Sequence, residues 1–465
     1  MQNRLTAIAA FTLGIAATAT SAPALAQYQF LTTIQIPASP SNNVSGRFES
    51  YDISYFDPTT QLDYVADRSN ASIDIFSAKT NTYVSRIGGS NGVFTGLPIG
   101  APTAVAGPDG VVVVPGSGAQ PSQVWAGNGN STLLAFNLSN GGTTGTQPSF
   151  SPIPTGPVSA NRVDEIIYDP NSNQILAANN AATPAPFLTF VNASTGAINR
   201  QVTFNGLGGT PNATNGIEQP AYDPFTNRFY VSVPQLNGSG PGAVAQLNAA
   251  GDVTHIFDLA TLGLGAGGVC GPTGLMAGAG GSLIVGCGDG GSSVILHAAA
   301  NGGNGTIKVI NGVGGEDQVW YDPVTKRYFL SARNNPGGPV LGIIDAVSET
   351  LLQTLATTPG AHSVSVDPIS GEVFVPFGAP TGRADCPNGC IGVFALIGAG
   401  AANVCDDARW LGPLGIRCAP RKAQYSLNTY CVTQENPLRR VFSRVKSDEF
   451  SGADSVSLAL WIHAM

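Results

Sequence analysis

The chain has 465 residues, a formal net charge of −8 and only 11% charged residues, about half the share found in an average globular domain. Hydrophobic residues make up 43% of the chain, which is enough for a large buried core. The acidic balance and the absence of a basic stripe argue against nucleic acid as a partner.

The first 26 residues match a secretory signal peptide. Arg4 supplies a positive charge, an Ala-rich apolar run extends from Leu5 to Ala19, and Ala24-Leu25-Ala26 is typical of a cleavage site. An uncleaved membrane anchor is the alternative, but the apolar run is shorter than the roughly 20 residues of a spanning helix. We therefore predict a secreted or periplasmic protein with no membrane span after signal cleavage.

One phrase recurs along the rest of the chain: a short alternating strand, Asp-Pro, a polar turn and a second apolar strand. Its aspartates are Asp57, Asp169, Asp223, Asp322 and Asp367. Two further units, at 104–113 and 275–285, keep this rhythm with glycine-rich turns in place of Asp-Pro. Counted from the residue five before each aspartate, the units begin at 52, 102, 164, 218, 272, 317 and 362. Seven units of this length are typical of propeller blades.

Each unit also supplies a third and a fourth strand, except the last. After the third strand at 392–396 no fourth strand follows, whereas the strand at 28–36 precedes the first unit and has no partner. Pairing these two segments would close the ring and remove an exposed sheet edge. The sequence thus predicts an all-β fold over residues 27–400: a seven-bladed β-propeller with four-stranded blades, closed by its N-terminal strand.

The second strands carry a further signature. Tyr64-Val-Ala-Asp67, Tyr230-Val-Ser-Val233 and Leu176-Ala-Ala-Asn179 each follow an Asp-Pro turn. In this the chain resembles the YVTN-type and lactonase-like seven-bladed β-propellers over residues 27–400. The resemblance implies the architecture far more than an activity, and the second and fifth units depart from the family phrase.

Seven cysteines are consistent with an oxidising compartment. Cys386 and Cys390 enclose a Pro-Asn-Gly turn and predict a small local disulfide. Cys270 and Cys287 flank two adjacent predicted strands and are the second candidate pair. Three cysteines remain, Cys405, Cys418 and Cys431, so one of them stays unpaired. No group of cysteines in the sequence has the paired ligand spacing of a zinc site.

Residues 401–465 differ in composition from the repeats. They hold eight Lys and Arg against six Asp and Glu, a net +2, whereas residues 27–400 hold 12 against 23, a net −11. No repeat phrase occurs in this segment. We interpret it as an appended, partly disordered tail; a small disulfide-held module and a translation artefact are the alternatives.

In a four-stranded blade, the loop entering the first strand and the loop joining the second to the third emerge on the face nearest the channel mouth. We expect functional side chains there. The first loop set carries ionisable groups at equivalent positions, with Pro102 and Pro272 in the two degenerate units: Asp52, Asp164, Glu218, Asp317 and His362. Glu165, Gln219, Glu316 and Gln318 stand beside them. The candidate ligand-binding residues of the two loop sets are Gln219, Gln318, Arg68, Asn128, Asn179, Arg333 and Arg383.

Carboxylates gathered at one mouth repel each other unless they share a proton or a cation. A hard ion such as Ca²⁺ held by oxygen ligands would relieve this repulsion, and its candidate ligands are Asp52, Asp164, Glu218 and Asp317. His362 and Glu218 are the candidate catalytic proton carriers, and the arginines could hold a carboxylate-bearing ligand. In the structural alternative, the acids accept backbone hydrogen bonds from the next blade. We expect each Asp-Pro aspartate to cap its own turn, and Trp125 and Trp320 to lie in the core.

The leading hypothesis is a secreted, monomeric and noncatalytic module that binds a small molecule or an extracellular protein at the channel mouth. The main alternative is a metal-assisted lactonase or ring-opening lyase acting on a small carboxylated substrate, as the family resemblance allows. A structural role at the cell surface is the third interpretation. The sequence contains no nucleophile elbow, phosphate-binding loop or metalloprotease helix.

Overall fold

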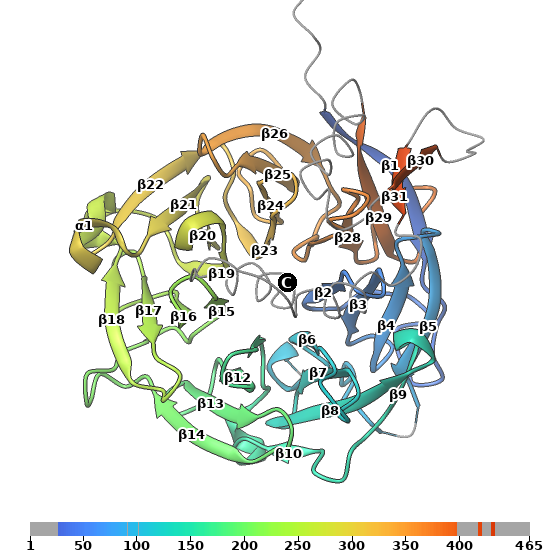
Figure 1. Cartoon of the computed structure of the whole chain (residues 1–465), viewed down its shortest axis with the longest axis horizontal. Helices are drawn as coiled ribbons and strands as arrows, with labels where there is room; N and C mark the ends of the chain where they lie inside the picture. Colours follow the sequence, from blue (N-terminus) through green and yellow to red (C-terminus); the bar gives the residue numbers. More distant parts are fainter. Residues whose placement is uncertain (1–26, 91, 101, 398–416, 421–428, 433–465) are drawn as a thin grey trace, which may run out of the picture.

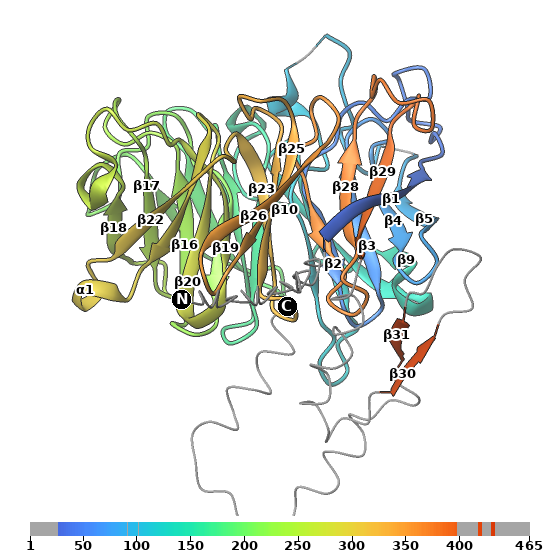
Figure 2. The same ribbon diagram turned by 90° about the horizontal axis from the view of Figure 1, so that it is seen from above.

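The computed structural model describes residues 27–90, 92–100, 102–397, 417–420 and 429–432. Seven antiparallel sheets stand around a central axis, so the predicted seven-bladed β-propeller is confirmed (Figure 1). Figure 2 shows the ring from the side, where inner strands such as β23 (Glu316–Asp322) run along the channel and outer strands such as β26 (Thr350–Ala356) cross obliquely.

The strands of each blade follow one another outward from the axis. The first blade contains β2 (Ser54–Asp57), β3 (Leu62–Asp67), β4 (Ser72–Ser77) and β5 (Thr82–Gly88). The second contains β6 (Val111–Val114), β7 (Gln123–Asn128) and β8 (Thr132–Ser139), and both β9 (Thr144–Thr146) and β10 (Ile153–Pro154) pair with β8. The third contains β11 (Ile166–Asp169), β12 (Gln174–Asn179), β13 (Phe187–Asn192) and β14 (Ile198–Thr203).

The remaining blades repeat this order. The fourth blade contains β15 (Pro220–Asp223), β16 (Arg228–Val233), β17 (Ala243–Leu247) and β18 (Val253–Asp258), and the fifth contains β19 (Pro272–Ala277), β20 (Ser282–Cys287), β21 (Ser292–His297) and β22 (Thr306–Asn311). The sixth contains β23, β24 (Arg327–Ala332), β25 (Val340–Asp345) and β26. The seventh contains β27 (Ser365–Val366), β28 (Val373–Phe377), β29 (Cys390–Ile397) and β1 (Gln27–Gln35). A one-turn helix, α1 (Ala300–Gly303), precedes β22, and β30 (Arg417–Pro420) pairs with β31 (Thr429–Val432).

The burial of the strands follows from their radial position. The second strands β3, β7, β12 and β20 are buried along their whole length because neighbouring blades cover both of their faces. The outer strand β26 instead alternates between exposed and half-buried residues, since only one face meets the core. The core is therefore divided into clusters that lie between adjacent blades.

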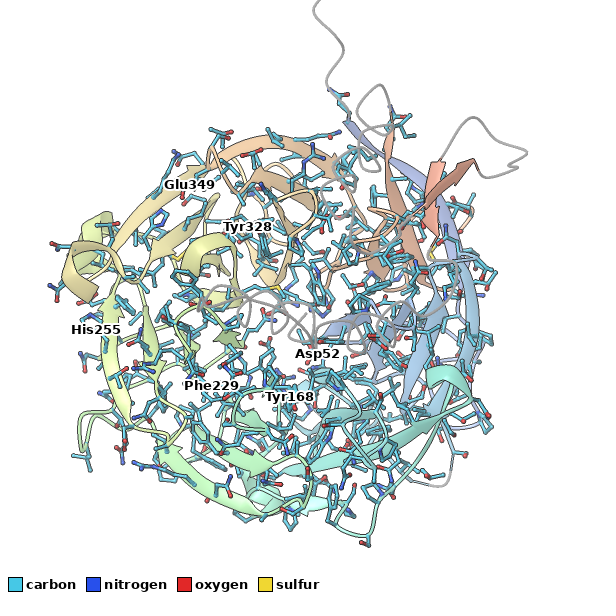
Figure 3. The ribbon with its side chains drawn as sticks, in the orientation of Figure 1. Asp52, Tyr168, Phe229, His255, Tyr328 and Glu349 are labelled. Atoms are coloured by element: carbon cyan, nitrogen blue, oxygen red, sulfur yellow. A yellow bond between two sulfur atoms is a disulfide. The ribbon has the colours of Figure 1, made fainter. Side chains whose placement is uncertain are left out.

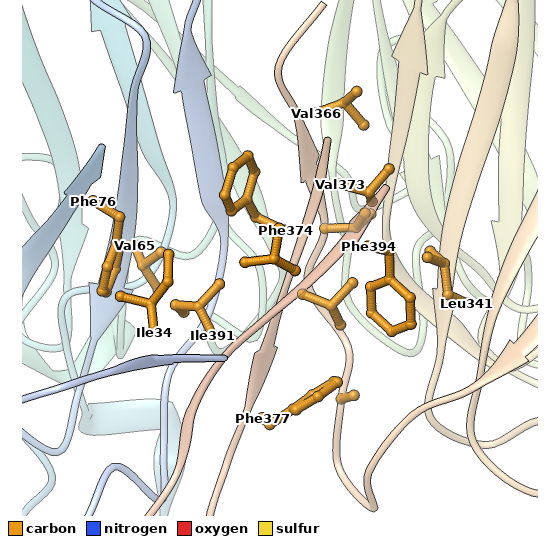
Figure 4. Packing of buried hydrophobic residues seen from close by; sticks show 14 of the residues in the cluster. Ile34, Val65, Phe76, Leu341, Val366, Val373, Phe374, Phe377, Ile391 and Phe394 are labelled. Atoms are coloured by element: carbon orange, nitrogen blue, oxygen red, sulfur yellow. The ribbon is translucent and has the colours of Figure 1, made fainter. Parts of the chain in front are cut away.

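The ring closes as predicted. Strand β1 pairs antiparallel with β29 from Gln27 opposite Ile397 to Gln35 opposite Cys390. Ile34 of β1 packs in a cluster that includes Val65 and Phe76 of the first blade and Phe394 of the last (Figure 4). This cluster joins the two ends of the chain of blades, because it contains residues of the first blade and of the closing sheet.

The Asp-Pro aspartates cap their own turns, as the sequence predicts. In each, Oδ1 accepts a hydrogen bond from the backbone N–H two residues later, at 2.8–3.0 Å; the five donors are Thr59, Asn171, Phe225, Val324 and Ile369. These bonds make the turn between the first two strands of a blade a local, sequence-encoded structure.

The expectation for the second unit was wrong in register. Residues 103–105 form a short 3₁₀ turn, not a strand, and the segment 111–114 is the first strand of the blade, not the second. Val114-Pro115 stands where the other blades have Asp-Pro, so Asp109, five residues earlier, takes the position assigned to Pro102. The backbone N–H of Asp109 donates to the Gly127 carbonyl at 3.1 Å and fixes this register.

Both predicted disulfides are present, Cys270–Cys287 and Cys386–Cys390. In the two-stranded sheet of the tail, Cys418 lies opposite Cys431. The signal-peptide prediction and most of the tail, including Cys405, lie outside the described residues. Within the described part of the chain, no helix is long and apolar enough to cross a membrane.

Candidate functional site

The entry loops of the blades bring their ionisable residues together around the channel. Asp52 lies near the axis in Figure 3. Three sets of ligand atoms each lie within 4.8 Å of one another: Asp52, Asp317 and His362; Asp52, Asp109 and Asp164; and Glu165, Glu218 and Asp317. We call the six carboxylates of these sets the channel acids. Four of the five ionisable entry-loop residues that the sequence singled out are channel acids, and the fifth, His362, lies in a set with two of them.

Three arginines pair with the channel acids. Arg68 lies between two of them, with its Nη2 at 2.6 Å from both Asp52 Oδ2 and Asp109 Oδ1. It also donates through Nη1 to the Tyr51 carbonyl at 2.9 Å. Arg162 Nε lies 2.8 Å from Asp164 Oδ1, and Arg333 Nη2 lies 2.9 Å from Asp317 Oδ2. Ion pairs of this kind thus hold four of the six acids, Asp52, Asp109, Asp164 and Asp317.

The arginines do not balance the acids. Among the described residues, six carboxylates face three guanidinium groups, so the fully ionised group carries a net charge of −3. Glu165 Oε2 and Asp109 Oδ2 are buried and have no hydrogen-bond partner. A buried carboxylate oxygen without a donor costs free energy, so it favours either a proton or a cation at that place.

The pKa shifts reflect this imbalance. Burial, together with the charges of Asp164 and Glu218, raises the pKa of Glu165 well above its ordinary value. Burial and Asp317 raise the pKa of Glu218 to about 8. Burial also acts on Asp52, but Arg68 and Arg162 outweigh it and hold the pKa of Asp52 below its ordinary value. These shifts favour the ionised form of Asp52 and the protonated form of Glu218 at pH 7, and they favour a proton or a cation on Glu165. An arginine neighbour does not by itself keep an acid ionised, since burial raises the pKa of Asp109 to about 7 and that of Asp164 well above its ordinary value.

His362 lies at the edge of the channel acids as a neutral ring. It stacks on Tyr51 with 4.4 Å between ring centroids, and its Nδ1 lies 2.6 Å from the Gly360 carbonyl oxygen. That contact assigns the proton to Nδ1 and leaves the Nε2 lone pair 3.8 Å from Asp52 Oδ1. Burial and the charge of Arg333 lower the pKa of His362. The ring can accordingly accept a proton or ligate a metal through Nε2.

The amide residues predicted to bind ligand are used to join blades. Gln318 Oε1 accepts from the backbone N–H groups of Ser54 and Val364, both at 3.1 Å, and so links three blades. Gln219 Oε1 accepts from Leu275 N–H at 2.9 Å. Asn179 and Asn128 likewise bond to neighbouring loops, Asn179 to Thr155 and Ser131, and Asn128 to Thr95. These contacts account for the amides without a ligand.

Arg383 lies elsewhere. It pairs with Asp385 at 2.7 Å, and its guanidinium covers the ring of Phe30 in β1, 4.0 Å from the centroid. These contacts hold it at the outer strand of the closing blade and not against the channel acids. Of the three predicted arginines, Arg68 and Arg333 reach the channel and Arg383 does not.

Sequence reasoning missed two members of the group, Asp109 and Arg162. Asp109 was hidden by the register error in the second unit, and Pro115 after the first strand was the signal that could have corrected it. Arg162 stands two residues before Asp164 in the same entry loop. Its pairing with that acid depends on the conformation of the loop, which no spacing rule gives.

The donor set suits a hard cation. It consists of carboxylate oxygens with one imidazole, contains no thiolate, and includes an unpartnered oxygen at Glu165. Calcium, magnesium and manganese ions prefer such ligands.

No protein-family model matches the chain, and no curated protein sequence matches it. Among solved structures, it is similar to the hydrazine synthase of Kuenenia stuttgartiensis, with a TM-score of 0.51 and 12% identity over 72% of this chain and 93% of that chain. It is also similar to virginiamycin B lyase from Staphylococcus aureus, with a TM-score of 0.51 and 13% identity over 80% of this chain and 100% of that chain. At such identities the likeness concerns the fold alone, and the YVTN-type resemblance stays a prediction.

Proposed function

We propose that this protein is an exported, noncatalytic and monomeric binding module that takes a cationic ligand at the channel acids. The observation that carries this proposal is the unbalanced negative charge, six acids against three arginines, with a buried and unpartnered oxygen at Glu165. A hard divalent cation such as Ca²⁺ is the simplest ligand of this kind. Of the four ligands predicted from the sequence, Glu218 and Asp317 lie in one set with Glu165, and this set is the proposed cation site. Asp52 and Asp164 lie together in another set, with Asp109.

Export is supported by two observations. Residues 1–26 carry the pattern of a secretory signal peptide, and the described chain contains two disulfides, which persist in oxidising compartments. We further propose that the chain is a divergent YVTN-type propeller, because the Asp-Pro turns of that phrase recur in five blades.

Calcium titration tests the proposal. The purified mature chain is analysed for bound metal and then titrated with CaCl₂ in a calorimeter, before and after treatment with chelator. We expect saturable binding, a higher melting temperature with Ca²⁺, and an affinity at least about tenfold lower in Glu165→Gln, which removes one ligand charge.

The control variant is Asp252→Asn, which removes an acid that pairs with Arg200 on the exposed outer strands. It should bind Ca²⁺ as the wild type does. A chain that contains no metal, does not bind Ca²⁺ and melts at the same temperature with chelator would refute uptake of a metal cation.

A second function is favoured by the position of His362. A ring nitrogen of His362 lies in one set with ligand atoms of Asp52 and Asp317, and Asp317 also lies in a set with Glu218, whose pKa is raised to about 8. A metal-assisted lactonase or ring-opening lyase would use this arrangement, with the metal polarising a substrate carbonyl. His362 would accept a proton, Glu218 would donate one, and Arg333 would bind the substrate carboxylate.

Turnover separates the two functions. A lyase or lactonase would open small carboxylated lactones and lose this activity in His362→Gln and in Glu218→Gln while each variant keeps its fold. Absence of any lactone turnover in metal-loaded protein would leave the binding module as the function.

A further inference from the structure

The far end of the channel holds a cavity that the proposed function does not use. The innermost strands of the blades enclose it, and the prolines that follow those strands line it: Pro58, Pro115, Pro224, Pro323 and Pro368. The volume open to the centres of water-sized spheres is about 100 Å³. Figure 3 places Tyr168, which lines this cavity, close to the axis, as it does Asp52 of the acidic end.

The walls of this cavity are apolar and aromatic. Ile167, Tyr168 and Met276 line it and are only half-buried, so their apolar surfaces border empty space inside the ring. Tyr55 and Trp320 also line it and meet edge to face, with 5.8 Å between ring centroids. Protein interiors are normally packed without such voids, which makes an unfilled apolar cavity of this size a candidate for a ligand.

The cavity and the channel acids are consecutive along the same strands. Glu165 directly precedes Ile166 and Ile167, which line the cavity, and Glu218 likewise precedes Gln219 and Pro220. Two residues of extended strand span about 7 Å. None of the channel acids lines the cavity itself, but a molecule about 7 Å long that lies along the channel is long enough to reach them from it.

We propose that the channel binds a small organic amine, with its ammonium group against Glu165, Glu218 and Asp317 and its apolar body in the cavity. This rests on the proposed function, since it names the cationic ligand. A neutral apolar molecule would leave the unpartnered oxygen of Glu165 buried without a donor, and an anion would meet more acids than arginines. An ammonium group supplies both the charge and the missing hydrogen bonds.

The volume limits the size of the amine. A buried water needs about 10–15 Å³ on this measure, so the cavity holds roughly seven to ten water-sized positions. An apolar body of about that many non-hydrogen atoms fits, for example a phenyl ring with a short linker. A folded partner or a long peptide does not.

Calorimetry on the mature wild-type chain tests the proposal with three related small molecules: 2-phenylethylamine, ethylamine and 2-phenylethanol. The first has both the charge and the apolar body, and each of the others lacks one of them. We expect 2-phenylethylamine to bind at least about tenfold tighter than either, because only it satisfies both ends of the channel. Equal affinities within about twofold would overturn the proposal.

Two variants assign the contacts. Glu165→Gln should weaken 2-phenylethylamine about tenfold and leave 2-phenylethanol unchanged. Ile167→Thr should weaken both aromatic probes and leave Ca²⁺ binding unchanged, whereas Ile198→Thr, the same substitution on the exposed outer strand β14, should change neither. The probe series needs no variant, so a failure of Ile167→Thr to fold leaves the test intact.

The outcomes separate this inference from the proposed function. If Ca²⁺ binds and depends on Glu165, but the apolar body of the amine adds no affinity, only the amine proposal fails. If neither Ca²⁺ nor any amine binds, the cationic ligand itself is refuted and both fail.

Discussion

Arg68 offers the sharpest test of the charge arrangement in the channel. The change is Arg68→Met, which keeps an unbranched side chain of similar length and removes the charge. In the wild type this guanidinium lies 2.6 Å from a carboxylate oxygen of both Asp52 and Asp109, and its side chain is 6% exposed. The variant removes the nearest cation of both acids and leaves Arg162, whose Nη1 lies 3.9 Å from Asp109 Oδ1, as the remaining guanidinium.

The expected cost follows from the burial of the pair. Breaking a buried ion pair by removing one partner costs about 3–5 kcal/mol, because the other charge stays buried and unpaired. The described ring contains roughly 370 residues, for which the entropy of unfolding is about 0.8 kcal/mol/K. The melting temperature should therefore fall by about 4–6 °C at pH 7.5.

The assay is thermal and denaturant unfolding at pH 7.5 and pH 5.5. Burial raises the pKa of Asp109 to about 7, so at pH 5.5 this acid is protonated without its arginine and the loss should shrink. The double variant Arg68→Met/Asp109→Asn should likewise lose less than Arg68→Met alone.

The matched control is Arg200→Met, which removes an arginine from an exposed pair with Asp252. Surface pairs of this kind contribute about 0–1 kcal/mol. If Arg68→Met costs no more than Arg200→Met, or if its cost does not depend on pH, water screens the channel acids and the reasoning on their charge is wrong.

Three further predictions concern stability. Burial raises the pKa of Asp63 to about 7, so the stability that its protonated form contributes is fully present below the unfolded-state pKa near 4 and is lost as pH rises through 7. Asp63→Asn keeps the oxygen that accepts from Ser365 and cannot ionise. The variant should therefore be more stable than the wild type at pH 8 by a few kcal/mol in urea unfolding. Ile34→Ala in the closing strand, where Ile34 is 3% exposed, should cost about 2–5 kcal/mol, and a loss below 1 kcal/mol would show that closure does not limit unfolding. Reduction of Cys270–Cys287, which closes a loop of 17 residues, should cost about 3 kcal/mol. In Cys270→Ala/Cys287→Ala, reductant can break only Cys386–Cys390 among the described disulfides, so this variant should lose about 3 kcal/mol less than the wild type when reductant is added.

The sequence offered two alternative roles for the entry-loop acids, joining blades and binding a cation, and the channel acids divide between them. Asp52 and Asp109 are held by Arg68 and help to join the first two blades, which is a structural role. Glu165 lacks such a partner and keeps a free buried oxygen. The excess of acids over arginines therefore lies on the side of Glu165, Glu218 and Asp317, and this is where a cation gains most.

The number of blades and the closing strand could be predicted from the sequence because both depend on local rules. An Asp-Pro turn caps itself within four residues, as at Asp57 with Thr59, and alternation marks each strand. The last unit lacked a fourth strand and the strand at 28–36 lacked a partner, so pairing the two was the arrangement that removed the exposed sheet edge. Where the local phrase was absent, in the unit of Asp109, the prediction lost its register.

The pairing of charges and the cavity were decided only by the tertiary structure. Whether Arg68 meets Asp109 of the next blade, or Arg383 turns outward onto Phe30, depends on loop conformations and on blades separated by dozens of residues. The apolar cavity likewise exists because seven inner strands stand at a common radius that their side chains do not fill. A one-dimensional pattern records which residues enter the ring, but the distances across the axis arise only when the ring has closed.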